Sequence, residues 1–484
     1  MYLGIDLGTS GLKLLLMDAA QRRVMTVDMP LSLQQPKPLW CEQAPSDWWA
    51  ALSAAVTQLR AQAPKDWAAI EAVGLSGQMH CAVVLDEQGQ VLRPAMLWND
   101  GRSAQQCADL ELAFPQARQI TGNLAMPGLT APKLLWLRQH EPAVFARIAR
   151  VLLPKDWLRW QLTGDAVSDM SDASGTWWLD VAQRRWHHAL LALCGLSEDQ
   201  MPRLVEGNQV SARLRPALAQ AWGLRDGVPV AGGAGDNAAS AVGVGAVSPG
   251  QGFVSLGTSG VIFRVTAAFA PAPERAIHAF AHALPKRWHQ MSVMLSAASA
   301  LTWLSRLTGQ SQARMAASVA KMPPAQRAHA PLFLPYLQGE RTPHNRPLLP
   351  ASFTGLRSDH GPVDLAYAVM EGVGFGLLDG WRAMGEGGPS HRSLALVGGG
   401  ARSEAWSQLL SSLLQCPLHC SDAAPVAAAL GAARLAWMAH TGQSHGPWDD
   451  SSHQGVWVPR PEETALLLQR HAQFGDRFAQ LHSA

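Results

Sequence analysis

The chain has 484 residues, of which 48% are hydrophobic and 16% charged, and its formal net charge is +2. This length predicts two or three domains rather than one core, and the composition is typical of a well-buried globular protein rather than a disordered chain. The nearly neutral charge gives no reason to expect nucleic acid or an anionic membrane as a partner.

Two copies of one short phrase mark the beginning and the middle of the chain. Leu-Gly-Thr-Ser-Gly stands at residues 7–11 and again at 256–260, each time between two strand-like runs. Two strands joined by such a turn predict a β-hairpin. The turn is ordinary hairpin chemistry, but it also gathers N–H groups and hydroxyls that suit a phosphate. Because the repeat indicates related half-chains, we expect a nucleotide held between two related domains.

One acidic residue distinguishes the first copy from the second. Asp6 directly precedes the first turn, whereas Ser255 takes that position in the second. A carboxylate beside a phosphate-binding turn is repulsive unless a cation lies between them, so Asp6 predicts Mg²⁺. The two halves are therefore not expected to have equivalent roles.

The remaining elements follow an α/β pattern in both halves. The region 165–230 is harder to assign and is expected to pack at the periphery, and a domain boundary is expected near residue 245. Glycines within the long helix over 363–384 predict close packing against another element. Strands are predicted over 24–29, 72–75, 81–85, 228–231, 290–295 and 393–397, and helices over 45–59, 132–138, 154–162, 238–244, 297–307, 363–384, from about 404, and within 423–439.

Asp236 is the strongest candidate for catalysis. It follows a buried strand and a glycine-rich turn, Gly-Gly-Ala-Gly at 232–235, and stands at a predicted helix start. Asp is also among the best helix N-caps, so a purely structural role is the alternative. The glycines keep the surroundings open to a substrate, and a positioned general base contributes about 10²–10⁴ in rate. We interpret Asp236 as a base that accepts the proton of an attacking hydroxyl.

A third glycine turn adds a nucleotide candidate. Gly398, Gly399, Gly400 and Ala401 join a predicted strand to a predicted helix, an arrangement that favours an anion or a ribose. By itself the run is weak evidence, because it also serves as an ordinary helix-entry turn. It gains weight as the third such turn in the chain.

Two polar clusters in the first half are candidates for recognising a small polyol. Gln78, Met79 and His80 follow a buried strand, and Trp98 begins the run Trp-Asn-Asp-Gly-Arg at 98–102. A lone histidine is more often structural, and the acid and arginine of the second cluster could form a simple salt bridge. Both clusters are kept as candidates on the substrate side.

Targeting signals and metal clusters are not evident. No apolar stretch reaches the roughly 18 residues of a membrane span, and the first residues read as a strand rather than a secretion signal. Six cysteines lack any CxxC pair, and Cys416 and Cys420 are interpreted as buried thiols because no second ligand pair accompanies them. A reducing, cytoplasmic location is expected.

The motifs resemble the FGGY carbohydrate kinases, which share a fold superfamily with actin, hexokinase and the heat-shock chaperone ATPases. The resemblance covers nearly the whole chain and fades after about residue 440. It implies two actin/hexokinase-like domains with a ribonuclease-H-like core and an active-site cleft between them: 1–245 on the sugar side and 246–440 on the nucleotide side, with a tail, 441–484, packing on the core. It rests on residues 5–10, 235–237, 256–260 and 398–402 and on two diagnostic stretches, 128–140 and 351–371.

The resemblance also implies roles for individual residues. Asp236 matches the catalytic base and Asp6 the acid that positions Mg-ATP, and both are expected near the metal. One departure is visible: Ala234 interrupts three glycines common in the family, and altered loop detail rather than lost activity is expected. The sugar side comprises Gln78, Met79, His80, Trp98, Asp236 and Asn237, and the nucleotide side Thr9, Ser10, Lys13, Gly257, Thr258, Gly398, Gly399, Gly400 and Ala401.

The implied reaction is ATP-dependent phosphorylation of a ketopentose at its terminal hydroxyl. Further runs at 76–80, 98–102, 153–156, 168–175 and 339–344 resemble the branch acting on D-xylulose. Glycerol, gluconate, ribulose and 1-deoxy-D-xylulose remain open as acceptors. A nucleotide-driven binding module and a sugar-sensing regulator without catalysis also remain, although retention of both acids disfavours the regulator. Sugar and ATP are the expected partners, with Mg²⁺ as cofactor, and a homodimer is left open.

Overall fold

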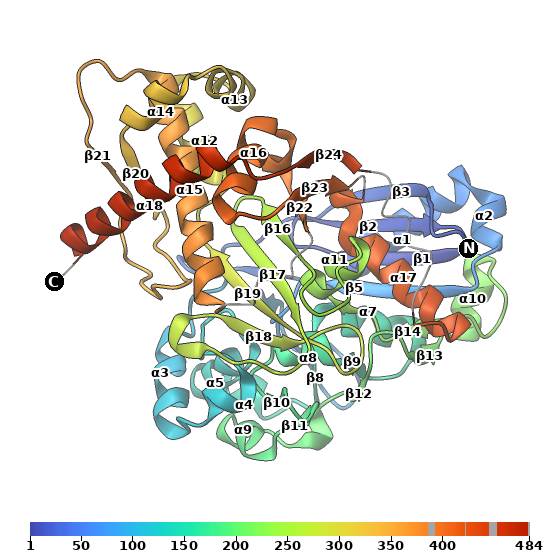
Figure 1. Cartoon of the computed structure of the whole chain (residues 1–484). Coiled ribbons are helices and arrows are strands. Elements are labelled where there is room, and N and C mark those ends of the chain that lie inside the picture. The colour runs from blue at the N-terminus through green and yellow to red at the C-terminus, as the bar shows by residue number, and fades with distance from the viewer. Residues whose placement is uncertain (386–392, 422, 445–452, 483–484) are drawn as a thin grey trace.

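The computed structural model describes residues 1–385, 393–421, 423–444 and 453–482. Figure 1 shows two α/β halves side by side, each with its own sheet. The sheet of the N-terminal half is seven-stranded, in the order β13-β14-β5-β1-β2-β3, with β15 also paired to β5. Its strands are β1 (Tyr2–Leu7), β2 (Gly11–Met17), β3 (Arg23–Pro30), β5 (Ala72–Gly77), β13 (Val210–Arg213), β14 (Pro229–Ala231) and β15 (Ala234–Gly235).

The second sheet repeats the plan of the first. Its order is β18-β19-β17-β16-β22-β23-β24. In each sheet an antiparallel hairpin, β1–β2 or β16–β17, pairs through its first strand with a parallel strand, β5 or β22. The predicted α/β class with two related halves is thereby confirmed. The strands are β16 (Gly252–Leu256), β17 (Gly260–Thr266), β18 (His278–Ala281), β19 (Trp288–Met294), β22 (Leu394–Val397), β23 (Leu418–Ser421) and β24 (His453–Trp457).

Helices cover the faces of both sheets. In the N-terminal half α1 contacts β2 and β3, and in the C-terminal half α15 contacts β17 and β19. The glycines of α15 allow the predicted close packing, since a Cβ at Gly372 would lie 2.2 Å from the carbonyl oxygen of Phe333. The longer helices are α1 (Pro45–Gln62), α3 (Ala104–Ala113), α5 (Thr130–His140), α7 (Pro154–Thr163), α11 (Asp236–Gly243), α12 (Ala298–Thr308), α13 (Gln312–Ala320), α15 (Pro362–Ala383), α16 (Glu404–Leu414), α17 (Ala427–Thr441) and α18 (Pro461–His482).

Short elements complete the described part of the chain. Most of them come between β5 and β13 in the chain. Those labelled in Figure 1 from β8 to β12 lie in the lower lobe of the molecule. The short elements are β4 (Glu42–Gln43), α2 (Pro64–Ala68), β6 (Val83–Leu85), β7 (Ala95–Met96), α4 (Ala117–Thr121), α6 (Pro142–Phe145), β8 (Arg150–Leu152), β9 (Val167–Asp169), α8 (Met170–Ser174), β10 (Leu179–Asp180), β11 (Arg185–Trp186), α9 (His188–Leu193), β12 (Arg203–Val205), α10 (Pro216–Trp222), α14 (Pro324–His329), β20 (Leu332–Leu334) and β21 (Ser352–Thr354).

Helices α11 and α17 join the two halves. Helix α17 contacts β1 and β5 of the N-terminal sheet as well as α11, although it comes late in the chain. Small residues permit this: a Cβ at Gly431 would lie 1.8 Å from the carbonyl oxygen of Ala239. The predicted buried helix within 423–439 is confirmed, because Ala429, Ala432 and Ala433 are fully buried.

The expectation that residues 165–230 lie at the periphery is wrong for β9 and α8. Asp169 and Asp172 are completely buried there together with Lys155 of α7. The Lys155 Nζ lies 2.8 Å from an Asp169 oxygen and 3.1 Å from an Asp172 oxygen. Charged residues in a sequence usually indicate the protein surface. Here they are buried because the positive charge of Lys155 is paired with the negative charges of the two aspartates.

The end of the chain packs on the C-terminal half. Helix α18 contacts α15 and α16, and its Arg470 donates to both carboxylate oxygens of the fully buried Glu371, each at 2.6 Å. Of the predicted tail, residues 445–452 and 483–484 lie outside the described residues.

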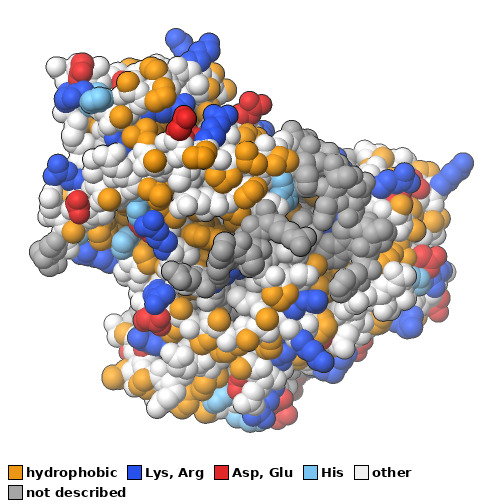
Figure 2. Space-filling model, in the orientation of Figure 1, with side chains coloured by type: hydrophobic (Ala, Val, Ile, Leu, Met, Phe, Trp, Pro, Cys, Tyr) orange, Lys and Arg blue, Asp and Glu red, His pale blue; other side chains and the backbone are white. Residues whose placement is uncertain are grey.

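Among the residues that the structure describes, no helix is long and apolar enough to cross a bilayer. On the face drawn in Figure 2, Lys and Arg side chains are interspersed with Asp and Glu.

Candidate active site

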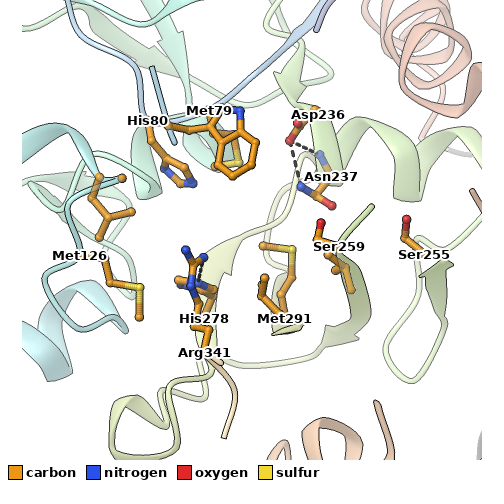
Figure 3. Close-up of a pocket in the computed structure, with 15 residues that line it drawn as sticks. Met79, His80, Met126, Asp236, Asn237, Ser255, Ser259, His278, Met291 and Arg341 are labelled. Atoms are coloured by element: carbon orange, nitrogen blue, oxygen red, sulfur yellow. Dashed lines mark hydrogen bonds between the residues drawn. The ribbon is translucent and has the colours of Figure 1, made fainter. Parts of the chain in front are cut away.

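A cavity of about 250 Å³ lies between the two halves and takes its wall from both (Figure 3). The N-terminal half contributes Met79, His80, Trp98, Met126, Gly128, Leu129, Asp236 and Asn237. The C-terminal half contributes Ser255, Ser259, Val261, His278, Met291, Val293 and Arg341. A molecule in this cavity would therefore contact both halves at once.

Asp236 provides the acidic end of the cavity. It is the first residue of α11, while the preceding Gly235 occupies the N-cap position, so the alternative that Asp236 caps the helix is wrong. One carboxylate oxygen accepts from the backbone N–H of Asn237 at 2.7 Å and from its side-chain amide at 3.0 Å. Burial, and then the nearby Asp6 carboxylate, raise the pKa of Asp236 to about 6. Asp236 can therefore accept a proton near neutral pH.

The turn before Asp236 explains why one alanine is tolerated among its glycines. Gly233 has φ +71°, and a Cβ there would lie 2.1 Å from the carbonyl oxygen of Leu75. Ala234, in contrast, belongs to β15, pairs with Ser76 and is fully buried in an apolar cluster. Gly233, where a side chain would clash, is therefore a glycine, and the methyl group of Ala234 lies where a side chain fits.

Asp6 lies behind the acidic end, on β1. It pairs with Lys13 across the hairpin and lies next to Ser76 of β5. Its Oδ1 is buried without a hydrogen-bond partner among the described residues, and burial raises its pKa. Nowhere in the described chain do three or more His, Cys, Asp or Glu side chains form a metal cluster. Two carboxylates are nevertheless a typical protein share of a Mg²⁺ site that is completed by phosphates and water.

His80 and Met79, both predicted on the substrate side, line the cavity together with Asp236. Burial lowers the pKa of His80 to about 3, so the ring is neutral at pH 7. Its Nδ1 lies 2.9 Å from the carbonyl oxygen of Gly175 and must be the protonated nitrogen, because a carbonyl only accepts. The Nε2 is then free to accept a hydrogen bond from a hydroxyl in the cavity.

Gln78, Thr9 and Trp98 form a chain of hydrogen bonds rather than a common wall. Trp98 lines the cavity and donates to the Thr9 hydroxyl at 2.9 Å, which donates to the Gln78 carbonyl oxygen at 2.9 Å. Gln78 and Thr9 do not line the cavity themselves. Their hydrogen bonds connect the first hairpin turn to Trp98 in the wall of the cavity.

Asp100 and Arg102, at the end of the predicted polar run at 98–102, have a structural role. Arg102 pairs with Asp100 at 2.6 Å and with Glu42 at 2.7 Å, and its guanidinium stacks on Trp40 at 3.5 Å. The simple salt bridge considered from the sequence is therefore present.

A larger cavity of about 990 Å³ adjoins the second hairpin turn. Of the predicted nucleotide residues it brings together Gly257, Thr258, Gly399 and Gly400, at the start of α12 and α16, with the small residues of α13 forming another wall. Gly398 and Ala401 flank this wall without lining it. Ser10 is exposed in the first turn, and Lys13 pairs with Asp28 at 2.7 Å instead of lining either cavity.

The second hairpin turn separates the two cavities and contributes to both. Ser255 and Ser259 face the smaller cavity, whereas Gly257 and Thr258 face the larger one. Both cavities therefore share this turn as part of their walls.

Sequence reasoning missed the basic end of the smaller cavity. Arg341 and His278 lie across from Asp236 (Figure 3). The run at 339–344 that contains Arg341 is informative in the sequence only through its resemblance to one family branch. Nothing in the sequence placed it beside residues of the other half.

Comparisons with known proteins agree with this architecture. Residues 1–243 match the N-terminal domain model, and residues 252–440 the C-terminal domain model, of the FGGY family of carbohydrate kinases. The chain therefore belongs to the FGGY family of carbohydrate kinases, and the predicted family and sugar-kinase class are confirmed.

Several relatives are similar over nearly their whole length. The chain is 49% identical to the xylulose kinase of Escherichia coli (strain K12), covering 97% of this chain and 99% of that protein. It is 48% identical to the xylulose kinase of Klebsiella pneumoniae, covering 96% and 94%. The crystal structure of a xyloylose kinase from Brucella ovis superposes with a TM-score of 0.94 at 46% identity, covering 100% of this chain and 99% of that one.

Proposed function

We propose that this carbohydrate kinase phosphorylates D-xylulose to D-xylulose 5-phosphate. The observation that carries the proposal is the pair of cavities that share one hairpin turn, with Asp236 at the end of the smaller one. The smaller cavity has the volume of a small polyol and the larger one that of a nucleotide. The names of the full-length relatives support D-xylulose as the acceptor.

Asp236 is proposed as the general base. The terminal hydroxyl of the acceptor donates its proton to the Asp236 oxygen that does not receive the two Asn237 hydrogen bonds. The hydroxyl oxygen then forms the bond to the γ-phosphorus of ATP, while the bond to the β,γ-bridging oxygen breaks and ADP leaves. His80 Nε2 and Trp98 orient the acceptor, and the apolar Met79 and Met291 exclude water that would otherwise compete.

The nucleotide is proposed to occupy the larger cavity. The small side chains Ala316, Ala317 and Ala320 of α13 offer a flat apolar wall suited to a purine. Gly257 and Thr258, with Gly399 and Gly400, offer closely approaching backbone and a hydroxyl for the phosphates. Thr9 and Ser10 of the first turn would meet the γ-phosphate from the other half. Charge on the transferring group is thereby stabilised from both sides.

Asp6 is the residue proposed to hold Mg²⁺, with the Asp236 carboxylate close to the metal. The unpartnered, buried Oδ1 of Asp6 fits this role, because an orphaned carboxylate oxygen is costly unless a cation balances it. When bound, Mg²⁺ neutralises charge on the phosphates. The five buried cysteines and the use of ATP fit a reducing compartment, so we place the reaction in the cytoplasm.

The test is an assay of ADP release with Mg-ATP and a panel of acceptors. D-xylulose should stimulate ADP release strongly, and glycerol, L-ribulose and gluconate much less. Stimulation by a different polyol alone would keep the mechanism and overturn the acceptor. Nucleotide binding without stimulation by any acceptor would favour a binding module over a kinase.

A further inference from the structure

The basic end of the smaller cavity is built around a guanidinium without an acidic partner. Arg341 lines the cavity from the loop between β20 and β21. Within the described residues no carboxylate lies within salt-bridge distance of its guanidinium. The adjacent Glu340 uses one oxygen to accept the backbone N–H groups of Leu295 at 3.0 Å and of Arg341 at 2.7 Å. A half-buried cation that lines a cavity and is not paired with an acid inside the protein indicates a ligand that pairs with it.

The neighbours of Arg341 orient it, and the two histidines that line the cavity near it add no charge of their own. The amide of Asn123 donates to the carbonyl oxygens of Thr121 and Ala279, which makes its Oδ1 an acceptor. His278 Nδ1, 2.7 Å from this Oδ1, must then be the donor. Its Nε2 accepts from Arg341 Nη1 at 3.3 Å. Burial lowers the pKa of His278 well below its usual value and that of His80 to about 3, so both rings are neutral.

This arrangement leaves the Nε and Nη2 groups of Arg341 for a ligand. These two N–H groups form a planar fork that matches two adjacent oxygens. Figure 3 shows Arg341 and Asp236 on opposite sides of the cavity. An acyclic acceptor with its reacting hydroxyl at Asp236 therefore extends its other end toward Arg341.

We propose that Arg341 recognises the non-reacting end of the acceptor by donating to the adjacent hydroxyl and carbonyl oxygens of an open-chain α-hydroxyketone. This inference rests on the proposed function, since it takes D-xylulose as the acceptor and its 5-hydroxyl as the reacting group. It makes Arg341 a specificity residue. Because the residue belongs to the C-terminal half, the acceptor site is complete only when both halves meet.

The test combines an acceptor that lacks one hydroxyl oxygen with enzyme variants that lack the Arg341 guanidinium. We would measure kcat/KM for D-xylulose and for 1-deoxy-D-xylulose, which lacks the terminal hydroxyl at carbon 1, with the wild-type protein, Arg341→Met and Arg341→Lys. Arg341→Met should lower kcat/KM for D-xylulose by about 10- to 100-fold. The wild-type preference for D-xylulose over the deoxy sugar should shrink to about twofold or less. Arg341→Lys keeps the positive charge but lacks the planar pair of N–H groups. Its kcat/KM for D-xylulose should lie between those of the wild type and Arg341→Met.

The control is Arg346→Met, which removes an exposed arginine from the same loop and should leave both constants unchanged. If Arg341→Met keeps the wild-type preference between the two sugars, or the wild type has none, the inference is overturned. If wild type does not phosphorylate D-xylulose at all, the proposed function fails instead. Should Arg341→Met not fold by circular dichroism, the same comparison with Arg341→Lys decides: an unchanged preference contradicts the inference, and a reduced one supports it.

Discussion

At the scale of single residues, Asp236 combines a fixed position with an unusual acidity. Its two hydrogen bonds from Asn237 hold one oxygen and stabilise the charged form, whereas burial and Asp6 disfavour that form. The opposing effects leave it a better proton acceptor than an exposed aspartate, whose pKa is near 3.9. The chemistry of the site therefore depends on where this carboxylate lies more than on its residue type.

Replacing the proposed base should stop turnover without removing the acceptor site. Asp236→Asn keeps the shape and should lower kcat by about 10²–10⁴, because the amide cannot take the proton. Binding of D-xylulose, measured by calorimetry without nucleotide, should change only severalfold. Asp165→Asn, at an exposed position, is the matched control. An unchanged kcat in Asp236→Asn would remove Asp236 from the mechanism.

The pH profile should report the same carboxylate. Since the base must be deprotonated, kcat/KM should rise with pH through a limb near pH 6. In Asp6→Asn the repulsion between the two carboxylates is gone, so the limb should move to lower pH even though overall activity falls. A limb that stays at the same pH in this variant would show that Asp6 does not act on Asp236.

The raised pKa of Asp236 also predicts a cost in stability. The folded protein holds the proton up to about pH 6, whereas the unfolded chain releases it near 3.8. Stability is therefore lost as pH rises between these values and stays lower above them. At pH 7 Asp236→Asn should raise the free energy of unfolding on the order of 1 kcal/mol. Urea titrations at pH 4 and pH 7 check this, and a gain that is equal at both pH values would contradict it.

At the scale of elements, identical sequences form hairpins that differ in register. Leu7 pairs with Leu12 around the first turn, but Leu256 pairs with Gly260 around the second, one residue short of the corresponding partner. A one-residue shift turns the following strand over. Leu12 is accordingly buried in the core, whereas its counterpart Val261 lines the smaller cavity.

The sequence predicted the elements that are determined by local residue patterns. It did not predict the features that depend on contacts between residues far apart in the chain. The hairpins, the helix start at Asp236 and the buried α17 follow from turn residues and apolar periodicity. The register of the second hairpin, the buried Lys155 cluster and Arg341 depend on contacts between distant segments. Gln78 was predicted as a sugar contact for its neighbourhood in sequence, yet its side chain is tied to Thr9 behind the wall.

The contact between α11 and α17 should tolerate no added methyl group. In Gly431→Ala the new Cβ would overlap the backbone of Ala239, so one helix must move, and we expect a loss of about 1–3 kcal/mol or more in urea unfolding. Gly475→Ala on α18 is the matched control, because nothing lies within 4 Å of its Cβ. That change should be neutral or stabilise by up to about 1 kcal/mol through helix propensity. Equal effects of the two substitutions would contradict the close contact.

At the scale of the whole molecule, the smaller cavity requires both halves. Asp236, His80 and Trp98 come from one half, and Ser259, His278 and Arg341 from the other. The larger cavity, proposed above to hold the nucleotide, is lined by described residues from 256 onward. An acceptor should therefore couple the two halves, and a nucleotide alone should act mainly on the C-terminal one.

Thermal unfolding can separate these two effects. At about 100 times its dissociation constant, D-xylulose should add about 2.7 kcal/mol to the stability of any state that binds it. Because the bound state needs both halves, the entire calorimetric transition should move to higher temperature as one peak. A nonhydrolysable ATP analogue alone should raise the melting of the C-terminal half more than that of the N-terminal half, which broadens or splits the transition. If D-xylulose instead moves one part of the transition and leaves another in place, the acceptor is held by a single half, and the shared wall of the cavity is not a working site.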